Sequence, residues 1–553
     1  MDTAPTLTNW LGQLWSRRLF PGPPRAADPP RPVSLLILLI LPALLLYPSL
    51  GFRLIEPDES RYAQIPREML QRGDLVVPTL QGEPYLDKPP LFYWLVMLSY
   101  RAFGVHDWAA RLVPAVAVHL TILVTYLLGR RALGERAAFA AALVLTLAPG
   151  FVTVSRLLIL DGLLTLCVAV SLFASFEAVR GERLRWPWWL LAALATGLGV
   201  LTKGPVAAPP ARPAAVAEPP ADGRQLPPGW RAWAAFLAVV LALALPWYVA
   251  LSWRLPGFIG YFFWEHNLQR FLDQKMHTRG VWFYAPVLWL MLLPAALLLL
   301  PLLRFLFSLD ESVAQRRPAE LGFCLLAGGW CVFFFTLSSC KLPTYILPAL
   351  PFLALVIGAF LVETGWARTP LVRGVAVAGM AFVLFAHHLA LPWYAGYRSP
   401  MSRPAEVLAL CADRSTPVVC FPRNCDSVAF YLGRDDLHAF RSKDIEELRT
   451  LVRVQPRTVI LCTHRHSLAG LKQLLPPEVR IAQECRMGLA DIHGVPPWAM
   501  KPLAKLMGET ALGLADLAVI EMPPLLGKAS PAAEPAGLSR RGWHPSRRKS
   551  HHD

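Results

Sequence analysis

Residues 33–47 read Val33-Ser-Leu-Leu-Ile-Leu-Leu-Ile-Leu-Pro-Ala-Leu-Leu-Leu-Tyr47, and the apolar run continues to Phe52. This length satisfies the roughly 20 apolar residues that a membrane-spanning helix needs. The rest of the 553-residue chain has the same character, because 55% of its residues are hydrophobic, only 17% are charged and its mean hydropathy is +0.41. This composition excludes a simple cytosolic enzyme. The sequence therefore predicts an all-α polytopic membrane bundle.

Further apolar runs extend the same pattern along the chain. They lie near 92–104, 110–129, 136–154, 160–179, 186–201, 232–252, 282–305, 320–337, 343–362 and 371–393. With the first run they predict a bundle of about 11 to 13 transmembrane helices, several of them short for a bilayer core of roughly 30 Å. The aromatic run 92–104 is also compatible with a helix that lies along the membrane interface.

The charge distribution predicts how the bundle is oriented. Residues 1–32 carry four arginines and no cleavable signal, so by the positive-inside rule they form a cytoplasmic N-terminal segment. Residues 53–91 then form the first loop on the exterior side. The chain has 54 Lys and Arg against 38 Asp and Glu, a net charge of +16. We attribute this excess to topology and anionic lipid, not to nucleic acid, because no nucleic-acid recognition fold accompanies it.

The predicted transmembrane domain spans residues 33–397. One segment within this domain and the part of the chain that follows it depart from the membrane pattern. Residues 205–229 are rich in proline, which breaks helices, so this atypical segment is either a loop or a span lost through a local sequence lesion. From residue 398 to 522 charged and apolar segments alternate, and strands at 416–421 and 457–462 with a helix at 443–453 predict a small soluble α/β domain. Residues 523–553 form a basic tail with the composition of disordered segments.

The first exterior loop holds the densest set of charged side chains. In Glu56-Pro-Asp-Glu-Ser-Arg-Tyr62, the spacing of Asp58, Arg61 and Tyr62 places all three on one face of a helix. In Asp87-Lys88-Pro89-Pro90, the prolines hold a carboxylate and an ammonium group on extended backbone near the membrane boundary. The alternative for such a charged stretch is a solvated connector.

Ionisable residues also occur inside or beside apolar runs. Asp161 lies within 157–166 and Lys203 within 201–205. A charge at the centre of a span costs about 2.5 to 3.5 kcal/mol on insertion scales, so both residues are functional candidates. The alternatives are snorkelling and a structural ion pair. Glu265, His266 and Arg270 form a further cluster, which could supply a metal ligand and a phosphate clamp.

Five motifs together resemble one family. They are Glu56-Pro-Asp-Glu-Ser-Arg-Tyr62, Tyr85-Leu-Asp-Lys-Pro-Pro90, Leu201-Thr-Lys-Gly204, Glu265-His-Asn-Leu-Gln-Arg-Phe271 and Lys341-Leu-Pro-Thr-Tyr-Ile-Leu-Pro348. In this order, over about residues 34 to 395, they resemble the ArnT-like and protein O-mannosyltransferase superfamily. These are GT-C glycosyltransferases that use polyprenyl-phosphate sugars. The resemblance implies a multi-helix membrane bundle with a catalytic cavity at its exterior interface.

The resemblance also implies roles for individual residues. By motif position, Asp58 and Asp161 are the catalytic carboxylates, and Arg61, Lys88 and Arg270 bind the lipid phosphate. Glu59, Tyr62, Tyr85, Lys203 and Tyr345 line the cavity. Asp87 and His266 match positions associated with a divalent metal, zinc in the aminoarabinose transferases, although those enzymes commonly carry Glu where this chain has Asp87.

Elementary chemistry agrees with these roles. When a sugar leaves a lipid phosphate, negative charge grows on the phosphate, so cations placed beside it stabilise the transition state. An attacking hydroxyl group requires a carboxylate base, for which Asp58 is the candidate. If the acceptor is itself a phosphate, no strong base is required, and Asp58 positions groups instead.

The sequence therefore predicts an inverting, polyprenyl-phosphate-sugar-dependent glycosyltransferase of the bacterial inner membrane. Its acceptor is expected to be lipid A, another glycan or a protein, with the active site and the C-terminal domain in the periplasm. Two alternatives remain open. The first is a transporter or flippase of lipid-linked sugars, which broken helices and internal repeats would favour. The second is a catalytically inactive scaffold member.

Overall fold

A computed structural model describes residues 28–181, 183–207, 228–269, 271, 279–401, 404–462, 467–485 and 516–522. Its contacts divide the chain into two compact units. The membrane unit comprises Met1–Leu50, Asp87–Leu95 and Arg111–His387, and the loop–sheet unit comprises Gly51–Leu86, Val96–Ala110 and His388–Asp553. Most of the predicted N-terminal segment, most of the proline-rich segment and the whole basic tail lie outside the described residues.

The membrane unit is built from helices. Those wholly within it are α2 (Pro32–Leu46), α6 (Glu135–Leu147), α7 (Pro149–Arg156), α8 (Asp161–Val179), α9 (Trp186–Lys203), η2 (Pro205–Ala207), α11 (Trp230–Arg254), η3 (Gly260–Gln269), η4 (Val281–Phe283), α13 (Tyr284–Met291), η5 (Ala295–Leu298), α14 (Leu299–Phe307), α15 (Glu311–Ala314), α16 (Leu321–Leu337), η6 (Pro343–Ala349), α17 (Leu350–Glu363), η7 (Trp366–Arg368) and α18 (Pro370–Phe385). Helices α4 (Leu91–Phe103), α5 (Asp107–Leu133) and η8 (Ala386–Ala390) run from one unit into the other.

Helix lengths show how the apolar runs fold. Within the described residues, five helices are long and apolar enough to cross a membrane, or seven if each of two bent pairs counts as one span. The pair α6 and α7 bends by 62°, and the segments Val281–Met291 and Ala295–Phe307 bend by 109°. Three shorter apolar helices are α2, α4 and α16. The apolar runs at 136–154 and 282–305 are therefore each divided between two helices.

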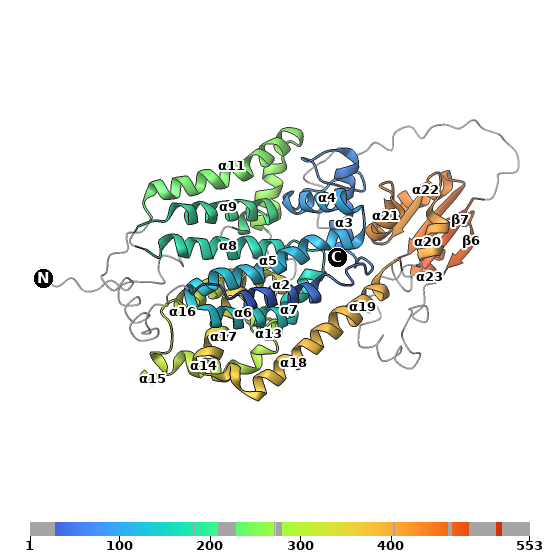
Figure 1. Ribbon diagram of the computed structural model, residues 1–553. Coiled ribbons are helices and arrows are strands. Elements are labelled where there is room, and N and C mark those ends of the chain that lie inside the picture. Colours follow the sequence, from blue (N-terminus) through green and yellow to red (C-terminus); the bar gives the residue numbers. More distant parts are fainter. Residues whose placement is uncertain are drawn as a thin grey trace. The chain divides into compact units, whose positions relative to one another are not determined.

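Small residues bring the helices of the membrane unit together. Figure 1 shows α8, α9 and α11 side by side in that order. A side-chain carbon added at Gly197 of α9 would lie 2.8 Å from Leu243 Cδ1 of α11, so the small residue lets the two helices approach closely. Gly358 likewise lets α17 lie against the backbone of α6 at Ala137. The main apolar core joins α2, α5–α8 and α13–α17, and a smaller cluster of Ala178, Trp189 and Ala232 joins α8, α9 and α11.

The loop–sheet unit combines the first loop with the C-terminal segment. Its loop part holds helix α3 (Asp58–Arg72) and the hairpin strands β1 (Thr79–Leu80) and β2 (Glu83–Pro84). Its C-terminal part holds α19 (Leu391–Arg398), α20 (Pro404–Cys411), β3 (Val418–Phe421), α21 (Asp426–Leu432), β4 (His438–Ala439), η9 (Ser442–Asp444), α22 (Ile445–Val454), β5 (Arg457–Cys462), α23 (Ser467–Leu474), β6 (Arg480–Cys485) and β7 (Asp516–Glu521).

The C-terminal strands form one mixed sheet in the order β4-β3-β5-β7-β6. Strand β3 pairs in parallel with β4 and β5, and β7 pairs antiparallel with β5 and β6. Alternate residues of each central strand face opposite sides, so one face packs on α20 and α21 and the other on α22 and α23. The predicted succession of strand, helix and strand, and with it the small α/β domain, is confirmed.

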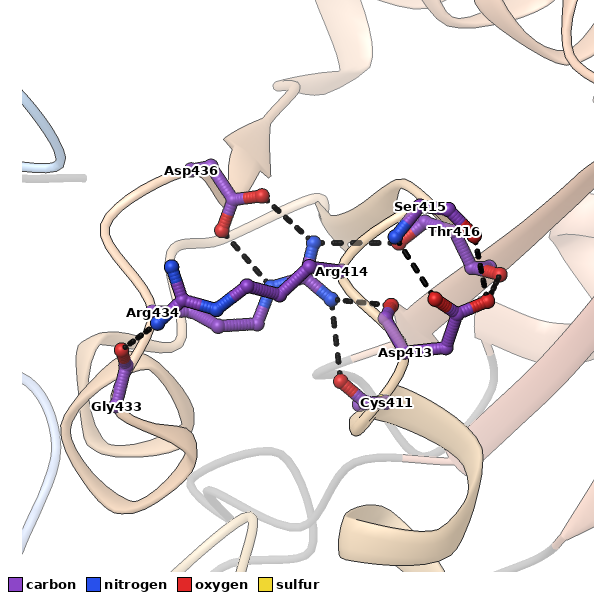
Figure 2. A network of polar contacts seen from close by, with 8 residues as sticks. All are labelled: Cys411, Asp413, Arg414, Ser415, Thr416, Gly433, Arg434 and Asp436. Atoms are coloured by element: carbon purple, nitrogen blue, oxygen red, sulfur yellow. Dashed lines mark hydrogen bonds and ion pairs between the residues drawn. The ribbon is translucent and has the colours of Figure 1, made fainter.

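Helix α3 is held against the C-terminal part of the same unit by polar contacts. The Gln64 amide donates to the Arg434 carbonyl oxygen at 3.1 Å, and the Arg67 guanidinium donates to the Ala429 carbonyl oxygen at 3.1 Å. The Arg434 side chain donates in turn to backbone carbonyls of residues 411–416 and to Asp436, as Figure 2 shows. The loop helix and the sheet therefore form one folded body.

Candidate active site

The predicted catalytic carboxylate Asp58 begins helix α3. Asp58 and Glu59 occupy its first turn, where negative charge is favoured by the helix dipole. The Arg61 guanidinium lies 3.7 Å from Asp58 Oδ1, one turn further on, and 3.5 Å from the Tyr85 hydroxyl. Tyr62 is buried on the same helix. The structure therefore brings together Asp58, Arg61 and Tyr85, and the predicted helical spacing of the first two is confirmed.

Glu59 differs from Asp58 in its surroundings. Its side chain is buried, and its Oε2 accepts a hydrogen bond from the Ile55 backbone N–H at 2.9 Å. Asp58, in contrast, is 58% exposed. Because a buried carboxylate that binds backbone amides is held in place, Glu59 fixes the start of α3, while Asp58 is accessible to a substrate. The predicted cavity role of Glu59 stays a prediction.

Buried acids surround the start of α3. Glu56 accepts hydrogen bonds from the Ser427 backbone N–H at 2.7 Å and from the Ser60 hydroxyl at 2.5 Å. Burial raises the pKa of Glu56. Burial, and then the negative charge of Glu56, raise the pKa of Asp426 to about 7. Burial lowers the pKa of Arg61, but nearby tyrosines and carboxylates, among them Asp426, outweigh it and raise that pKa above its ordinary value.

A second group of predicted residues lies in the membrane unit. Lys88 Nζ is 3.0 Å from His266 Nε2, and His266 Nδ1 is 3.8 Å from Asp87 Oδ1. The Tyr261 hydroxyl donates to Asp87 Oδ1 at 2.5 Å. The π-helix η3, which carries Tyr261 and His266, thus meets the segment that precedes α4. Two motifs 178 residues apart come together here.

Asp87 and His266 supply only part of a metal site. A zinc ion in a catalytic site usually takes three protein ligands. Among the residues that the structure describes, no group of three or more His, Cys, Asp or Glu side chains could hold a metal ion. Of the two His266 ring nitrogens, Nδ1 faces Asp87 at 3.8 Å, and Nε2 contacts the ammonium group of Lys88. A divalent metal therefore stays a prediction, and the chemistry below uses no step through it.

Asp161 and Lys203 form an ion pair. Lys203 Nζ lies 2.7 Å from Asp161 Oδ1, and the two side chains are only 14% and 12% exposed. The same ammonium group lies 4.5 Å from the centre of the Tyr345 ring. Asp161 begins α8 and Lys203 ends α9, so each charge also suits its helix terminus. The structural ion pair weighed from the sequence is present, and a catalytic role for Asp161 stays a prediction.

The predicted site residues thus occupy three local groups. Asp58, Glu59, Arg61, Tyr62 and Tyr85 belong to the loop–sheet unit. Asp87, Lys88 and His266 form one group in the membrane unit, and Asp161, Lys203 and Tyr345 form another. Arg270 lies outside the described residues. The joint binding of one phosphate by Arg61, Lys88 and Arg270 accordingly remains a prediction.

Sequence reasoning missed several polar residues of these groups. Tyr261, which donates a hydrogen bond to Asp87, lies five residues before His266 in an aromatic stretch. Its closeness to His266 in the sequence could have identified it as a site residue. Gln81 and Asn424 line a cavity with Arg61, but 343 positions separate them, 424 minus 81. No local pattern could have paired them.

Comparison with known proteins defines the class first. Residues 87–218 match the family described as dolichyl-phosphate-mannose-protein mannosyltransferase. The fold is that of the crystal structure of ArnT from Cupriavidus metallidurans bound to undecaprenyl phosphate, with a TM-score of 0.65 and 20% identity. The match covers 90% of this chain and 99% of that chain. The GT-C fold and the multi-pass membrane class predicted from the sequence are therefore confirmed.

Individual relatives define the resemblance more closely. The chain is 36% identical over 362 residues to the undecaprenyl phosphate-alpha-4-amino-4-deoxy-L-arabinose arabinosyl transferase of Pseudomonas savastanoi pv. phaseolicola, over 63% of this chain and 65% of that protein. It is 37% identical over 334 residues to the enzyme of that name from Pseudomonas aeruginosa strain LESB58, over 58% of each. The chain thus spans about three fifths of the length of these relatives. The resemblance to ArnT-like GT-C glycosyltransferases is confirmed.

Proposed function

We propose that this protein is an inverting glycosyltransferase that moves a sugar from a polyprenyl-phosphate donor to an acceptor of the bacterial envelope. The observation that carries the proposal is the convergence of Lys88 and His266 beside Asp87, because it unites two motifs of the GT-C resemblance. The sequence identity to arabinosyl transferases supports the same reaction.

Lys88 supplies the charge that the leaving group needs. As the bond between the anomeric carbon and the phosphate oxygen breaks, that oxygen gains negative charge. The Lys88 ammonium group can receive it, since the group is held by His266 at 3.0 Å and its backbone is fixed by the prolines that follow. Preplaced charge of this kind stabilises the transition state without reorganisation.

Asp58 supplies the base when the acceptor carries a hydroxyl group. The acceptor oxygen attacks the anomeric carbon, the sugar–phosphate bond breaks, and the hydroxyl proton passes to the Asp58 carboxylate. Its 58% exposure leaves it accessible, and Arg61 lies 3.7 Å from its Oδ1 atom. A phosphate acceptor would need no such proton transfer, and Asp58 would then orient the acceptor.

The relatives suggest the identity of the substrates. Their names specify undecaprenyl phosphate as the carrier and 4-amino-4-deoxy-L-arabinose as the sugar. We infer a lipid-linked sugar of this class as donor, and lipid A, another glycan or a protein as acceptor. The reaction then takes place on the periplasmic face of the inner membrane.

The purified full chain, incubated with a radiolabelled polyprenyl-phosphate sugar and acceptor, tests the proposal. We expect Asp58→Ala and Lys88→Ala each to reduce label transfer by about 100-fold or more, the range typical of a lost proton-transfer or charge-stabilising group. Arg72→Ala, at the exposed end of α3, is the matched control and should transfer at the wild-type rate. Full transfer by both test variants would refute the proposed roles.

One observation favours a second candidate. The bent pairs α6–α7 and α13–α14 provide the broken helices that a transporter of lipid-linked sugars would use. Reconstituted vesicles separate the two functions, because a flippase moves the labelled lipid across the bilayer without transferring its sugar. Transport without transfer would replace the glycosyltransferase proposal.

A further inference from the structure

Cysteines gather on one face of the C-terminal sheet. Cys411, Cys420 and Cys425 belong to one buried cluster on the side that packs on α20 and α21, and Cys485 packs against this cluster. Cys462 lies on the opposite face. The C-terminal part of the loop–sheet unit thus brings most of its thiols to one side of the sheet, where they can meet.

Cys420 and Cys425 are the pair whose thiols are in contact. Cys420 lies within β3 and Cys425 directly precedes α21, so residues 421–424 connect them. The two thiols are hydrogen-bonded to each other. Both side chains are buried, at 1% and 2% exposure. A disulfide needs Cβ atoms roughly 3.5 to 4.5 Å apart. Because the thiols already meet, small adjustments of the side chains and of the connecting loop are enough to reach this distance.

The other cysteines of this unit are placed differently. The Cys485 thiol donates to Glu406 Oε2 at 2.7 Å, and Cys462 packs with α22 and α23. Cys411 ends α20 and lies close enough to Cys420 for their charges to interact. Cys411 is therefore the competing partner that a test of the pairing has to distinguish.

The surroundings of Cys425 disfavour its thiolate form. The hydrogen bond with Cys420 and burial raise the pKa of Cys425, and the carboxyl groups of Glu56 and Asp426 add to this effect. The thiolate is the form that takes part in disulfide exchange. In the folded unit the pair is therefore a poor nucleophile, so a bond between the two sulfur atoms has to form while the domain folds, and burial then protects it.

We propose that Cys420 and Cys425 form a disulfide bond when the C-terminal domain folds on the exterior side of the membrane. Both S–H bonds break and the two sulfur atoms join. Two protons and two electrons pass to the disulfide of a thiol oxidoreductase of that compartment, which becomes a dithiol. Disulfides form and persist in the oxidising bacterial periplasm. The bond thus requires the periplasmic location of the domain that is proposed above.

The bond would fix the start of α21, where the first loop is held. The Ser427 backbone N–H, two residues after Cys425, donates to Glu56 at 2.7 Å, and Arg67 of α3 donates to the Ala429 carbonyl oxygen at 3.1 Å. A crosslink beside these contacts stabilises the folded unit, because it reduces the conformational freedom of the unfolded chain. The disulfide would therefore support the docking of α3.

Mass spectrometry of the full chain tests the bond directly. Trypsin cleaves after arginine, and Arg423 lies between the two cysteines, so Cys420 and Cys425 fall in separate peptides, 415–423 and 424–434. Cells are quenched in acid, and thiols are alkylated in denaturant before digestion. We expect most of the chain to yield these two peptides joined, at a mass two hydrogen atoms below their sum, and to release them separately after reduction.

Three results would overturn the proposed bond. The first is recovery of both peptides separately and alkylated, from a chain whose C-terminal reporter fusion is active in the periplasm. The second is a link between peptides 415–423 and 399–414, which would join Cys420 to Cys411. The third is separate peptides with an inactive reporter, which would overturn the orientation and the bond together. Sugar transfer is measured independently, so failure of the bond leaves the proposed transferase activity standing.

Thermal unfolding measures what the bond contributes to the fold. We expect the wild type, once reduced with dithiothreitol and verified by its peptide masses, to unfold about 5 °C lower than the oxidised chain, as for closure of a short loop. Cys420→Ala should show no such response to reductant, whatever its own unfolding temperature. Cys485→Ala, which keeps both paired cysteines, is the matched control and should respond like the wild type. An equal response of the wild type and Cys420→Ala would contradict the stabilising role of the pair.

Discussion

At the scale of single residues, Lys203 and Asp161 carry opposite charges that stabilise each other within the membrane unit. Their 2.7 Å ion pair is nearly buried, so removing one partner leaves the other charge without compensation. We expect Lys203→Met to lower the free energy of unfolding by about 3 kcal/mol and the double variant Asp161→Asn with Lys203→Met to recover most of it. Thermal unfolding in detergent measures both effects.

The same variants separate the two roles of the pair. If Asp161 acts on the substrate, the stable double variant still fails to transfer sugar. Arg231→Met, an exposed cation at the start of α11, provides the control for loss of a positive charge. Wild-type transfer by the double variant would show that the pair serves only the fold.

Asp426 gives the loop–sheet unit a pH dependence. Its pKa of about 7 lies above the ordinary value of 3.8, so the folded protein binds a proton that the unfolded chain releases. Stability therefore falls as the pH rises from about 4 to 7, by up to about 1.4 kcal/mol for each unit of pKa difference. We expect Asp426→Asn to match the wild type near pH 4 and to unfold at higher temperature at pH 8.

Thermal unfolding between pH 4 and pH 8 measures this difference, with the exposed Asp435→Asn as control. Parallel curves for wild type and Asp426→Asn would contradict the prediction. Burial raises the pKa of Glu56 as well, so Glu56 contributes a slope of the same sign.

The separation of two residues in the sequence determined whether their contact could be predicted. Asp58 and Arg61 are three positions apart, so helical geometry alone brings them together. The Tyr261–Asp87 hydrogen bond joins positions 174 residues apart, and it depends on how η3 packs, which periodicity does not describe. Contacts within one helix turn were therefore predictable, and contacts between distant segments required the resemblance or the structure.

At the scale of elements, the docking of α3 depends on two side chains. Gln64 and Arg67 each donate to a backbone carbonyl of the C-terminal segment. We expect Gln64→Leu with Arg67→Met to increase amide hydrogen exchange in α3 by about 10-fold to 100-fold, since a hydrogen bond to a charged group contributes about 1.5 to 3 kcal/mol. Hydrogen exchange read by mass spectrometry over Asp58–Arg72 measures the change.

Arg72→Met, at the exposed end of the same helix, should leave this exchange unchanged. Unaltered protection in the double variant would mean that apolar packing alone holds the helix. The strands β3 and β5 were predictable because they are short apolar runs rich in β-branched residues. The docking of α3 on α21 was not, because nothing in either segment specifies its partner.

At the scale of the whole molecule, topology can be tested directly. A cytoplasmic N-terminus and a periplasmic C-terminal domain require an odd number of crossings. We expect a fluorescent protein fused before residue 1 to fluoresce and alkaline phosphatase fused after residue 522 to be active, because each reporter works on one side of the inner membrane. An inactive phosphatase fusion of normal abundance would contradict this orientation.

The apolar runs predicted the membrane class and the GT-C fold but not every helix. Pro149 and Pro294 lie where two of the apolar runs bend. Hydropathy alone counts each of these runs as one span, although the backbone divides it into two helices. Run length therefore predicts that a segment enters the bilayer, whereas the course of the helix within it depends on packing.

The hydrogen bonds between α3 and the C-terminal part of the loop–sheet unit restrict which segments can be exchanged between relatives. Gln64 donates to the carbonyl of Arg434, whose side chain makes five hydrogen bonds. Arg67 donates to the carbonyl of Ala429, which also accepts from the Arg434 backbone N–H. A chimaera that exchanges the sheet while keeping the native first loop would bury donors without acceptors. Grafting both segments together preserves these contacts, so exchange of these parts between relatives should proceed through paired replacement.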